Sequence, residues 1–191
     1  MAVLALSFSG ATASAALVGA GFSAEVETAR GSGGASPGAL VQQLLGAPTA
    51  PLPTAVAVAL GPGSYTGIRM AVSFAKSFAL VRGLPLFAFT DHEALVALHA
   101  AEGEEVLVRH DGHGEREYWS RWVGSLPWPR RLEAEALGRP PDAVLLRVLG
   151  ERGGDPASAR LSARELATLA LRPGAPTAEL LLVEPVLPPG T

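Results

Sequence analysis

Residues 54–67 read TAVAVALGPGSYTG, an apolar run that leads directly into a glycine-rich loop. The run Thr54–Leu60 has no polar alternation, which is typical of a central strand covered on both faces. Residues 66–81 follow with apolar side chains at helical spacing, and Gly83 and Pro85 supply a helix stop. The stretch therefore predicts a strand, a loop and a helix in an α/β protein.

The loop, residues 61–67, lies where backbone N–H groups and a helix N-terminus can bind an anion. It is not a P-loop, because Ile68 and Arg69 follow its last glycine in place of lysine and Ser or Thr. It is not a nucleophile elbow either, because no residue separates Ser64 from the preceding glycine. The residues alone leave two interpretations: a phosphate cradle, or a tight turn in which Ser64 or Thr66 caps the helix.

Short strands and helices are predicted on both sides of this unit. The predicted strands are 3–8, 13–18, 22–28, 86–89, 106–110, 115–123, 143–149 and 180–183. The further predicted helices are 38–45, 91–100 and 162–171. The strand–turn–strand pattern at the N-terminus recurs from residue 106, which indicates an internal duplication. Beyond residue 125, prolines interrupt the pattern.

The composition is that of a compact globular protein. Hydrophobic residues make up 48% of the 191 residues and charged residues 17%. The net charge of -3 and the scattered arginines argue against a general nucleic-acid surface. Absence of cysteine excludes disulfides and thiolate metal sites and fits a cytoplasmic location. Polar residues interrupt the uncharged stretch before Glu25, so it predicts a buried hairpin and no membrane anchor.

Two predicted helices carry apolar stripes that must be covered. In helix 38–45 the stripe consists of Leu40, Val41, Leu44 and Leu45. Helix 66–81 is apolar on two faces, and one of them consists of Met70, Phe74 and Phe78. A helix with two apolar faces buries both inside the chain or buries the second one in a partner. These seven residues are therefore the expected partner interface.

The string GPGSYTGIR resembles the signature of the TsaB (YeaZ) family. The residues that carry this likeness are Gly61, Pro62, Gly63, Ser64, Tyr65, Thr66, Gly67 and Arg69. The chain is similar to the family from residue 3 to about residue 122, including Asp91 and residues 106–119. The stretch Val183–Val186 resembles the family's C-terminal Glu-Pro motif.

The resemblance implies a two-lobed, actin-like ATPase type of fold with a duplicated β-meander, divided into lobes at 1–101 and 102–191. It implies a non-catalytic subunit that binds and activates a TsaD-like transferase in threonylcarbamoyladenosine modification of tRNA. The implied partners are that subunit, a TsaE-like ATPase in the wider complex, and tRNA through the complex only. The apolar stripes themselves, left uncovered, predict pairing with a second copy when the chain is alone. No cofactor or metal of its own is implied, and a nucleotide at the partner interface stays open.

One departure from the family concerns Ser7, which stands where actin-like proteins usually carry an aspartate for phosphate and metal chemistry. The loss of that aspartate argues against autonomous ATPase activity. Two rival hypotheses remain: an actin-like ATPase or kinase that uses residues 61–67 for phosphate, and a ligand-binding module without a protein partner.

Two other groups of residues invite a functional interpretation. His110, Asp111 and His113 are metal-ligand types, but adjacent strand residues point to opposite faces, so a solvated turn is expected. Tyr118, Trp119 and Trp122 follow a charged stretch and could stack a base. Tyr118 and Trp122 share one strand face and Trp119 lies on the other, which favours a sheet packed on both sides. No Ser-His-Asp triad and no catalytic residue can be assigned.

Overall fold

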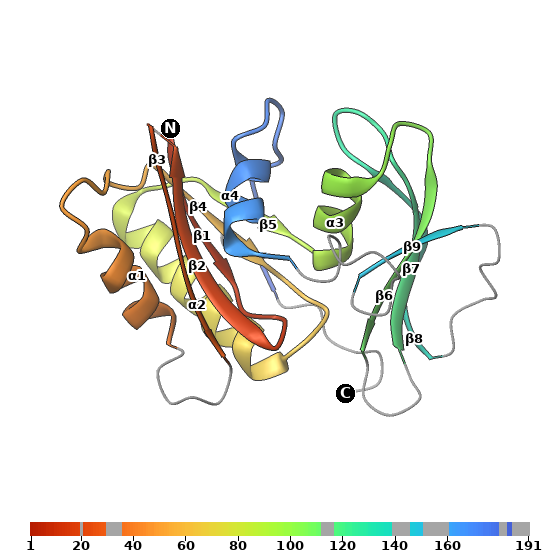
Figure 1. Cartoon of the computed structure of the whole chain (residues 1–191), viewed down its shortest axis with the longest axis horizontal. Helices are drawn as coiled ribbons and strands as arrows, with labels where there is room; N and C mark the ends of the chain where they lie inside the picture. Colours follow the sequence, from red (N-terminus) through yellow and green to blue (C-terminus); the bar gives the residue numbers. More distant parts are fainter. Residues whose placement is uncertain are drawn as a thin grey trace.

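The structure is a computed structural model, and it describes residues 1–19, 21–29, 36–111, 117–138, 146–150, 161–179 and 183–184. Two β-sheets, each the centre of one lobe, are joined by helices (Figure 1). Among the described residues, no helix is long and apolar enough to cross a membrane.

The first sheet has five strands in the order β3-β2-β1-β4-β5. The strands are β1 (Ala2–Ser7), β2 (Thr12–Gly19), β3 (Phe22–Ala29), β4 (Ala55–Ala59) and β5 (Leu86–Phe89). The first three form the predicted antiparallel meander, and β4 pairs in parallel with both β1 and β5. Every residue of β1 and β4 is buried, which confirms that the apolar run before the loop is a central strand.

The second sheet has four strands in the order β8-β7-β6-β9. The strands are β6 (Glu105–Asp111), β7 (Glu117–Val123), β8 (Arg130–Gly138) and β9 (Arg147–Leu149). An antiparallel meander with a parallel strand beside its first strand repeats the arrangement of the first sheet. The expected duplication is therefore present in the topology.

The C-terminal third differs from its predicted elements. Strand β8 was not predicted, because prolines precede it and its first residues, Arg130 and Arg131, lack an apolar alternation. Of the predicted strand 143–149, residues 147–149 form β9, and 143–145 lie outside the described residues. Residues 180–182 of the last predicted strand also lie outside them.

Among the described residues, each helix begins at a capping side chain, and the caps at Ser36 and Thr90 were predicted, with Ser64 as one of two alternatives. The helices are α1 (Pro37–Leu45), α2 (Tyr65–Arg82), α3 (Asp91–His99) and α4 (Ala163–Ala170). The side chains of Ser36, Ser64, Thr90 and Ser162 each accept a hydrogen bond from the backbone N–H three residues later. Helix α2 ends at Gly83, whose φ of 61° is left-handed and favours glycine.

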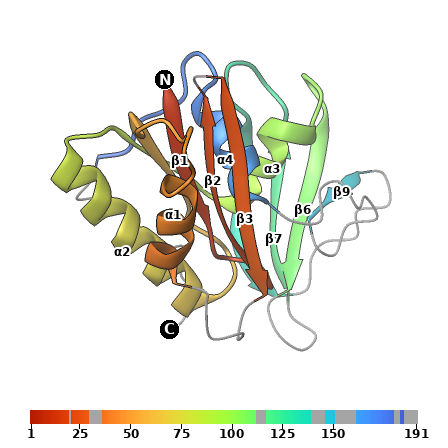
Figure 2. The same ribbon diagram turned by 60° about the vertical axis from the view of Figure 1, so that its left-hand side comes forward.

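The helices form layers on both faces of the first sheet (Figures 1 and 2). Helices α1 and α2 bury one face with Leu4, Leu6, Val56 and Val58. Helices α3 and α4 lie on the other face, between the two sheets, in a second core. Helix α4 packs against β1, β2 and β4, although it follows the second sheet in sequence. The division at residue 101 thus separates the two sheets, but α4 lies with the first.

Candidate functional site

The glycine-rich loop, residues 61–67, lies directly against the turn between β1 and β2. The backbone N–H of Ser64 donates to the carbonyl of Ser9 at 2.8 Å. Asp91, at the start of α3, accepts from the N–H of Gly61 at 2.9 Å and from the hydroxyl of Ser9. The N–H of Asp91 donates back to the Gly61 carbonyl at 2.7 Å. This buried carboxylate therefore ties three segments of the chain together.

Two glycines allow the loop to approach the β1–β2 turn this closely. A Cβ atom on Gly63, whose φ is +149°, would lie 2.4 Å from the Ser9 carbonyl oxygen. A Cβ atom on Gly67 would lie 2.3 Å from the carbonyl oxygen of Phe8. Real Cβ contacts are not that short, so both positions require glycine. The positions of these glycines in the loop thus reflect its close contact with the backbone of Phe8 and Ser9.

Several N–H groups of the loop and of the helix start are used inside the chain. Those of Gly61 and Ser64 bind Asp91 and Ser9, and those of Gly67 and Ile68 bind the side chain and carbonyl of Ser64. Ser64 is the helix cap, as one of the two interpretations predicted, and Thr66 is exposed. The geometry is that of a structural junction that fixes the start of α2.

The end of β1 is also occupied by the chain itself. The Ser7 hydroxyl donates to the carbonyl of Leu161 at 2.7 Å, and the Ser14 hydroxyl accepts from the N–H of Ala163 at 2.9 Å. Both serines are buried, and both bind the segment that begins α4. The place where actin-like proteins carry an aspartate is thus filled by a serine in contact with backbone.

The expected interface residues divide into two groups. Leu40, Val41 and Leu44 are buried in the core between α1 and the first sheet, because the single apolar stripe of α1 faces that sheet. They do not lie on the surface. Leu45, Phe74 and Phe78 are half-buried, and Met70 is 41% exposed.

Phe74 is held from two sides within the chain. Its ring is stacked on that of Phe78 with centroids 5.8 Å apart. Gly38 in α1 is close enough that an added Cβ would lie 3.7 Å from the Phe74 ring. Phe74 therefore contributes to the packing of α1 on α2.

The outer face of α2 exposes large apolar side chains that the sequence prediction missed. Leu80 is 69% and Val81 83% exposed, and Tyr65 is also exposed. Val81 follows Met70 by eleven residues, which places both on one side of the helix. The signal was present in this spacing, but neither apolar stripe assigned to the predicted helix 66–81 included Leu80 or Val81. We define the α2 outer face as the large exposed residues that lie on this side of the helix, which are Tyr65, Arg69, Met70, Leu80 and Val81.

A pair of buried histidines joins α3 to the second sheet. The rings of His92 and His110 are stacked with centroids 4.9 Å apart and an interplanar angle of 16°. Ser120 bridges His92 Nδ1, at 2.5 Å, and the indole N–H of Trp122, at 2.6 Å. Burial lowers the pKa of His110 to about 4, and burial together with His110 places the pKa of His92 well below its ordinary value.

The expected solvated turn is wrong for His110, which is buried against His92. His110 points inward to His92, whereas Asp111 is exposed, as strand alternation predicts. His113 lies outside the described residues, and the described part of the chain contains no group of three metal-ligating side chains. Trp122 is buried in the core, and Tyr118 and Trp119 are half-buried, in agreement with the packed-sheet interpretation.

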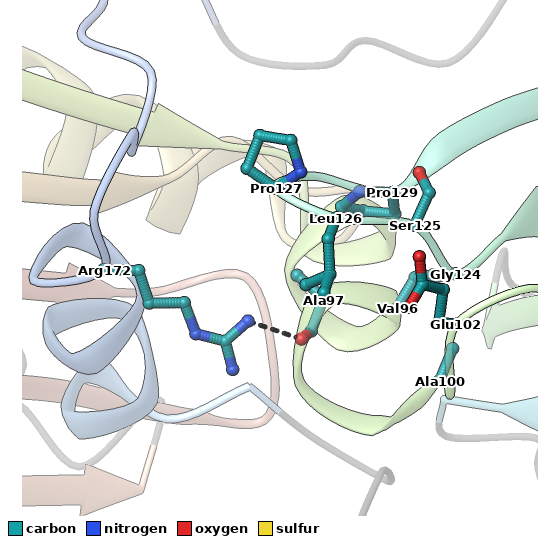
Figure 3. A pocket seen from close by; sticks show the side chains of 10 residues that line it. All are labelled: Val96, Ala97, Ala100, Glu102, Gly124, Ser125, Leu126, Pro127, Pro129 and Arg172. Carbon is teal, nitrogen blue, oxygen red and sulfur yellow. Dashed lines mark hydrogen bonds between the residues drawn. The ribbon is translucent and has the colours of Figure 1, made fainter.

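A small pocket of about 130 Å³ lies between α3 and the loop after β7 (Figure 3). Arg172, from the turn after α4, points toward α3 and donates to the carbonyl of Ala97 at 2.7 Å. Glu102 is the other charged residue of its lining. Since Arg172 binds a helix carbonyl and no group positioned for catalysis converges there, the loop and α2 form the stronger candidate site.

Known proteins include solved structures with the same fold as this chain. Residues 40–125 match the protein family TsaD, tRNA N6-adenosine threonylcarbamoyltransferase. The chain is similar to the crystal structure of an uncharacterized Pseudomonas aeruginosa protein with similarity to the peptidase YeaZ. The TM-score is 0.73 at 24% identity, over 97% of this chain and 98% of the other. No curated protein matches the sequence significantly.

A second structure agrees with the first. YeaZ from Pseudomonas aeruginosa superposes with a TM-score of 0.72 at 22% identity, over 97% of this chain and 99% of YeaZ. The fold is thus the expected two-lobed, actin-like α/β fold. The chain has the fold of YeaZ, the protein whose family signature the loop resembles, and part of it matches the TsaD family model.

Proposed function

We propose that the chain is a non-catalytic subunit that binds a TsaD-like transferase and activates it for threonylcarbamoyladenosine modification of tRNA. The observation that carries the proposal is the α2 outer face, which exposes Met70, Leu80 and Val81 on one helix. Exposed apolar patches of this kind mark interaction sites. The family-motif loop sets the position of this helix, because it fixes the helix start to the β1–β2 turn through Ser64.

The same geometry gives little support to the alternative, an autonomous ATPase or kinase. A phosphate cradle needs backbone N–H groups directed at the ligand, and those of Gly61, Ser64 and Gly67 already bind Asp91, Ser9 and the Ser64 side chain. Ser7 offers a hydroxyl already bound to Leu161 in place of a metal-binding carboxylate. We therefore assign the transfer chemistry to the partner.

The wider assembly follows from the same proposal. A TsaE-like ATPase would join the complex, and tRNA would be reached through the catalytic subunit in the cytoplasm. Without its partner, the exposed α2 outer face would favour weak association of two copies.

Substitution of Val81 tests the proposed surface. We expect Val81→Asp to weaken binding of the TsaD-like protein from the same cell by about tenfold or more, because it replaces the most exposed apolar side chain of the α2 outer face with a charge. Val81 is 83% exposed, so the thermal midpoint should stay within about 2 °C of wild type. Isothermal titration calorimetry gives the affinity, and scanning calorimetry gives the midpoint.

The matched control is Leu126→Asp, since Leu126 is 76% exposed on a loop of the second lobe, away from α2. It should leave the affinity unchanged. Phe74→Asp would not test the surface, because Phe74 packs against α1 and Phe78 and its loss would disturb the fold. Equal affinities for wild type and Val81→Asp, or no binding by wild type, would contradict the proposal.

A further inference from the structure

The small pocket of Figure 3 lies beside the layer of α3 and α4, on the face of the first sheet opposite to α1 and α2. Three segments far apart in the sequence bound it: the C-terminal half of α3, the loop after β7 and the turn after α4. Its volume is about 130 Å³. An apolar cavity of about 150 Å³ holds one benzene molecule, so this open pocket can take a molecule of about six to eight non-hydrogen atoms.

The loop that forms one wall of the pocket is held in place by its own contacts. The Ser125 hydroxyl donates to the carbonyl of Trp128 at 2.5 Å, and the indole N–H of Trp128 donates to the carbonyl of Gly174 at 2.7 Å. The Trp128 ring also stacks on Phe89 with centroids 5.6 Å apart. The wall is therefore formed before a ligand arrives, and a preformed site avoids the entropic cost of ordering a loop on binding.

The middle of the lining is apolar. Helix α3 and the residue after it contribute Val96, Ala97 and Ala100, and the facing loop contributes Pro127 and Pro129. Ligand pockets commonly combine such an apolar lining with a few polar groups that orient the ligand. The middle of this pocket is therefore suited to a short hydrocarbon group.

Arg172 supplies a cation whose position is fixed and whose hydrogen-bonding capacity is mostly unused. Its guanidinium is half-buried and donates to the carbonyl of Ala97 at 2.7 Å. A guanidinium has five N–H donors, and within the described ranges this is the one hydrogen bond that the Arg172 side chain makes. Guanidinium groups bind carboxylates through two parallel hydrogen bonds. Arg172 is therefore suited to hold the carboxylate of a ligand.

Glu102 supplies the opposite charge. Figure 3 shows Arg172 and Glu102 on opposite sides of Ala97. Glu102 is exposed, and among the residues that the structure describes none forms a hydrogen bond or an ion pair with its carboxylate. The C-terminal end of α3, which carries a partial negative charge, is three residues away in sequence. This end of the pocket therefore favours an ammonium group and repels a second carboxylate.

We propose that the pocket binds a small zwitterion, with its carboxylate at Arg172, its ammonium group at Glu102 and its hydrocarbon part against the apolar lining. Small aliphatic amino acids have this chemistry. The α-amino and ω-amino acids differ in the separation of their two charges, and the test compares them. The inference is independent of the proposed function, because the pocket shares no residue with the α2 outer face.

Titration of the 191-residue chain with named probes, followed by the NMR signals of its backbone amides, tests the proposal. The zwitterions are L-valine and 4-aminobutanoate. Isovalerate lacks the ammonium group, and isobutylamine lacks the carboxylate. We expect at least one zwitterion to bind with a Kd of about 1 mM or lower and to shift the signals of Ala97, Gly124 and Ser125. Each probe with a single charge should bind about tenfold more weakly or worse.

Substitution of Arg172 locates the ligand. Arg172→Gln retains a donor for the Ala97 carbonyl but removes the guanidinium, so we expect it to weaken zwitterion binding about tenfold or more. The matched control is Arg147→Gln, because Arg147 donates to another α3 carbonyl, that of His99, at 2.9 Å and does not line the pocket. It should leave the affinity within about twofold of wild type.

Glu102→Gln tests the other end of the pocket at an exposed position where the fold is not disturbed. It should remove the preference for a zwitterion over isovalerate, because the ammonium group loses its counter-charge.

Three results would overturn the inference. If neither zwitterion shifts the three amide signals at about 10 mM, the pocket holds water only. If isovalerate binds wild type as tightly as L-valine and 4-aminobutanoate do, the ligand is not a zwitterion. If Arg172→Gln and Arg147→Gln weaken binding equally, Arg172 does not hold the carboxylate. Each of these results leaves the proposed binding of a TsaD-like protein unaffected.

Discussion

Gly63→Ala is expected to destabilise the protein by about 3–5 kcal/mol, one of the two largest effects we predict. The new Cβ would lie 2.4 Å from the carbonyl oxygen of Ser9, and the residue would keep a φ of +149° that side chains rarely adopt. Relief of the contact would move the loop away from the β1–β2 turn and break the hydrogen bond from Ser64 to Ser9. Urea denaturation followed by circular dichroism measures the free energy of unfolding.

The control for this variant is Gly38→Ala in α1. Its Cβ would make an ordinary contact of 3.7 Å with Phe74, and its φ lies outside the left-handed region. Alanine in a helix is favoured over glycine, so this change should leave stability equal or raise it by up to about 1 kcal/mol. If Gly63→Ala were as stable as Gly38→Ala, the loop would not be in close contact with the β1–β2 turn.

Acidification is expected to destabilise the protein through the buried histidine pair. In the folded state the pKa of His110 is lowered by burial from 6.5 to about 4, so the unfolded chain binds a proton at higher pH than the folded chain. The stabilising contribution is therefore complete above pH 6.5 and is lost as the pH falls toward 4. Between pH 7 and about 4.5, His110 alone should reduce the free energy of unfolding by about 2–3 kcal/mol.

Two neighbouring titratable groups, His92 and Glu93, also contribute to the pH dependence of stability. His92 adds to the loss, because burial and the neighbouring His110 lower its pKa as well. Glu93 acts in the opposite direction, because burial raises its pKa, while Arg131 and the Thr90 backbone counteract that rise. The measurement is urea denaturation at a series of pH values from 7 to about 4.5.

His110→Phe is the variant that isolates the effect. It retains a flat ring against His92 and removes one titrating group, so the loss of stability on acidification should shrink by about 2 kcal/mol. A wild-type stability that does not change over this range, or an unchanged slope in His110→Phe, would contradict a buried neutral pair.

The sequence predicted the first lobe well because its signals are local. The run of apolar residues before the loop identified a central strand, and Ser36, Ser64 and Gly83 marked helix ends. Caps and stops depend on neighbours three or four residues away, so they are readable without the fold. Strand β8 was not predicted although Leu132, Ala134 and Ala136 alternate with charged residues, because prolines precede it and Arg130 and Arg131 open it. Its place in the sheet comes from its pairing with β7.

The candidate site could be predicted only in part. The loop motif indicated the family and the helix that follows it, and the apolar residues of α2 indicated a partner. The sequence did not reveal that Leu40, Val41 and Leu44 face the sheet and that Leu80 and Val81 face outward. Which stripe of a helix is buried depends on the direction from which the sheet packs against it, and that direction is a property of the whole lobe.

The sequence by itself determined the strand–loop–helix unit, its glycines and the net charge, since each follows from residue type and spacing. Only the tertiary structure decided why the glycines are needed, because Phe8 and Ser9 approach the loop from more than fifty residues earlier in the chain. It also decided that α4 returns to the first sheet and that His92 stacks on His110. These contacts join distant segments, and their free energy comes from burial shared by the whole core.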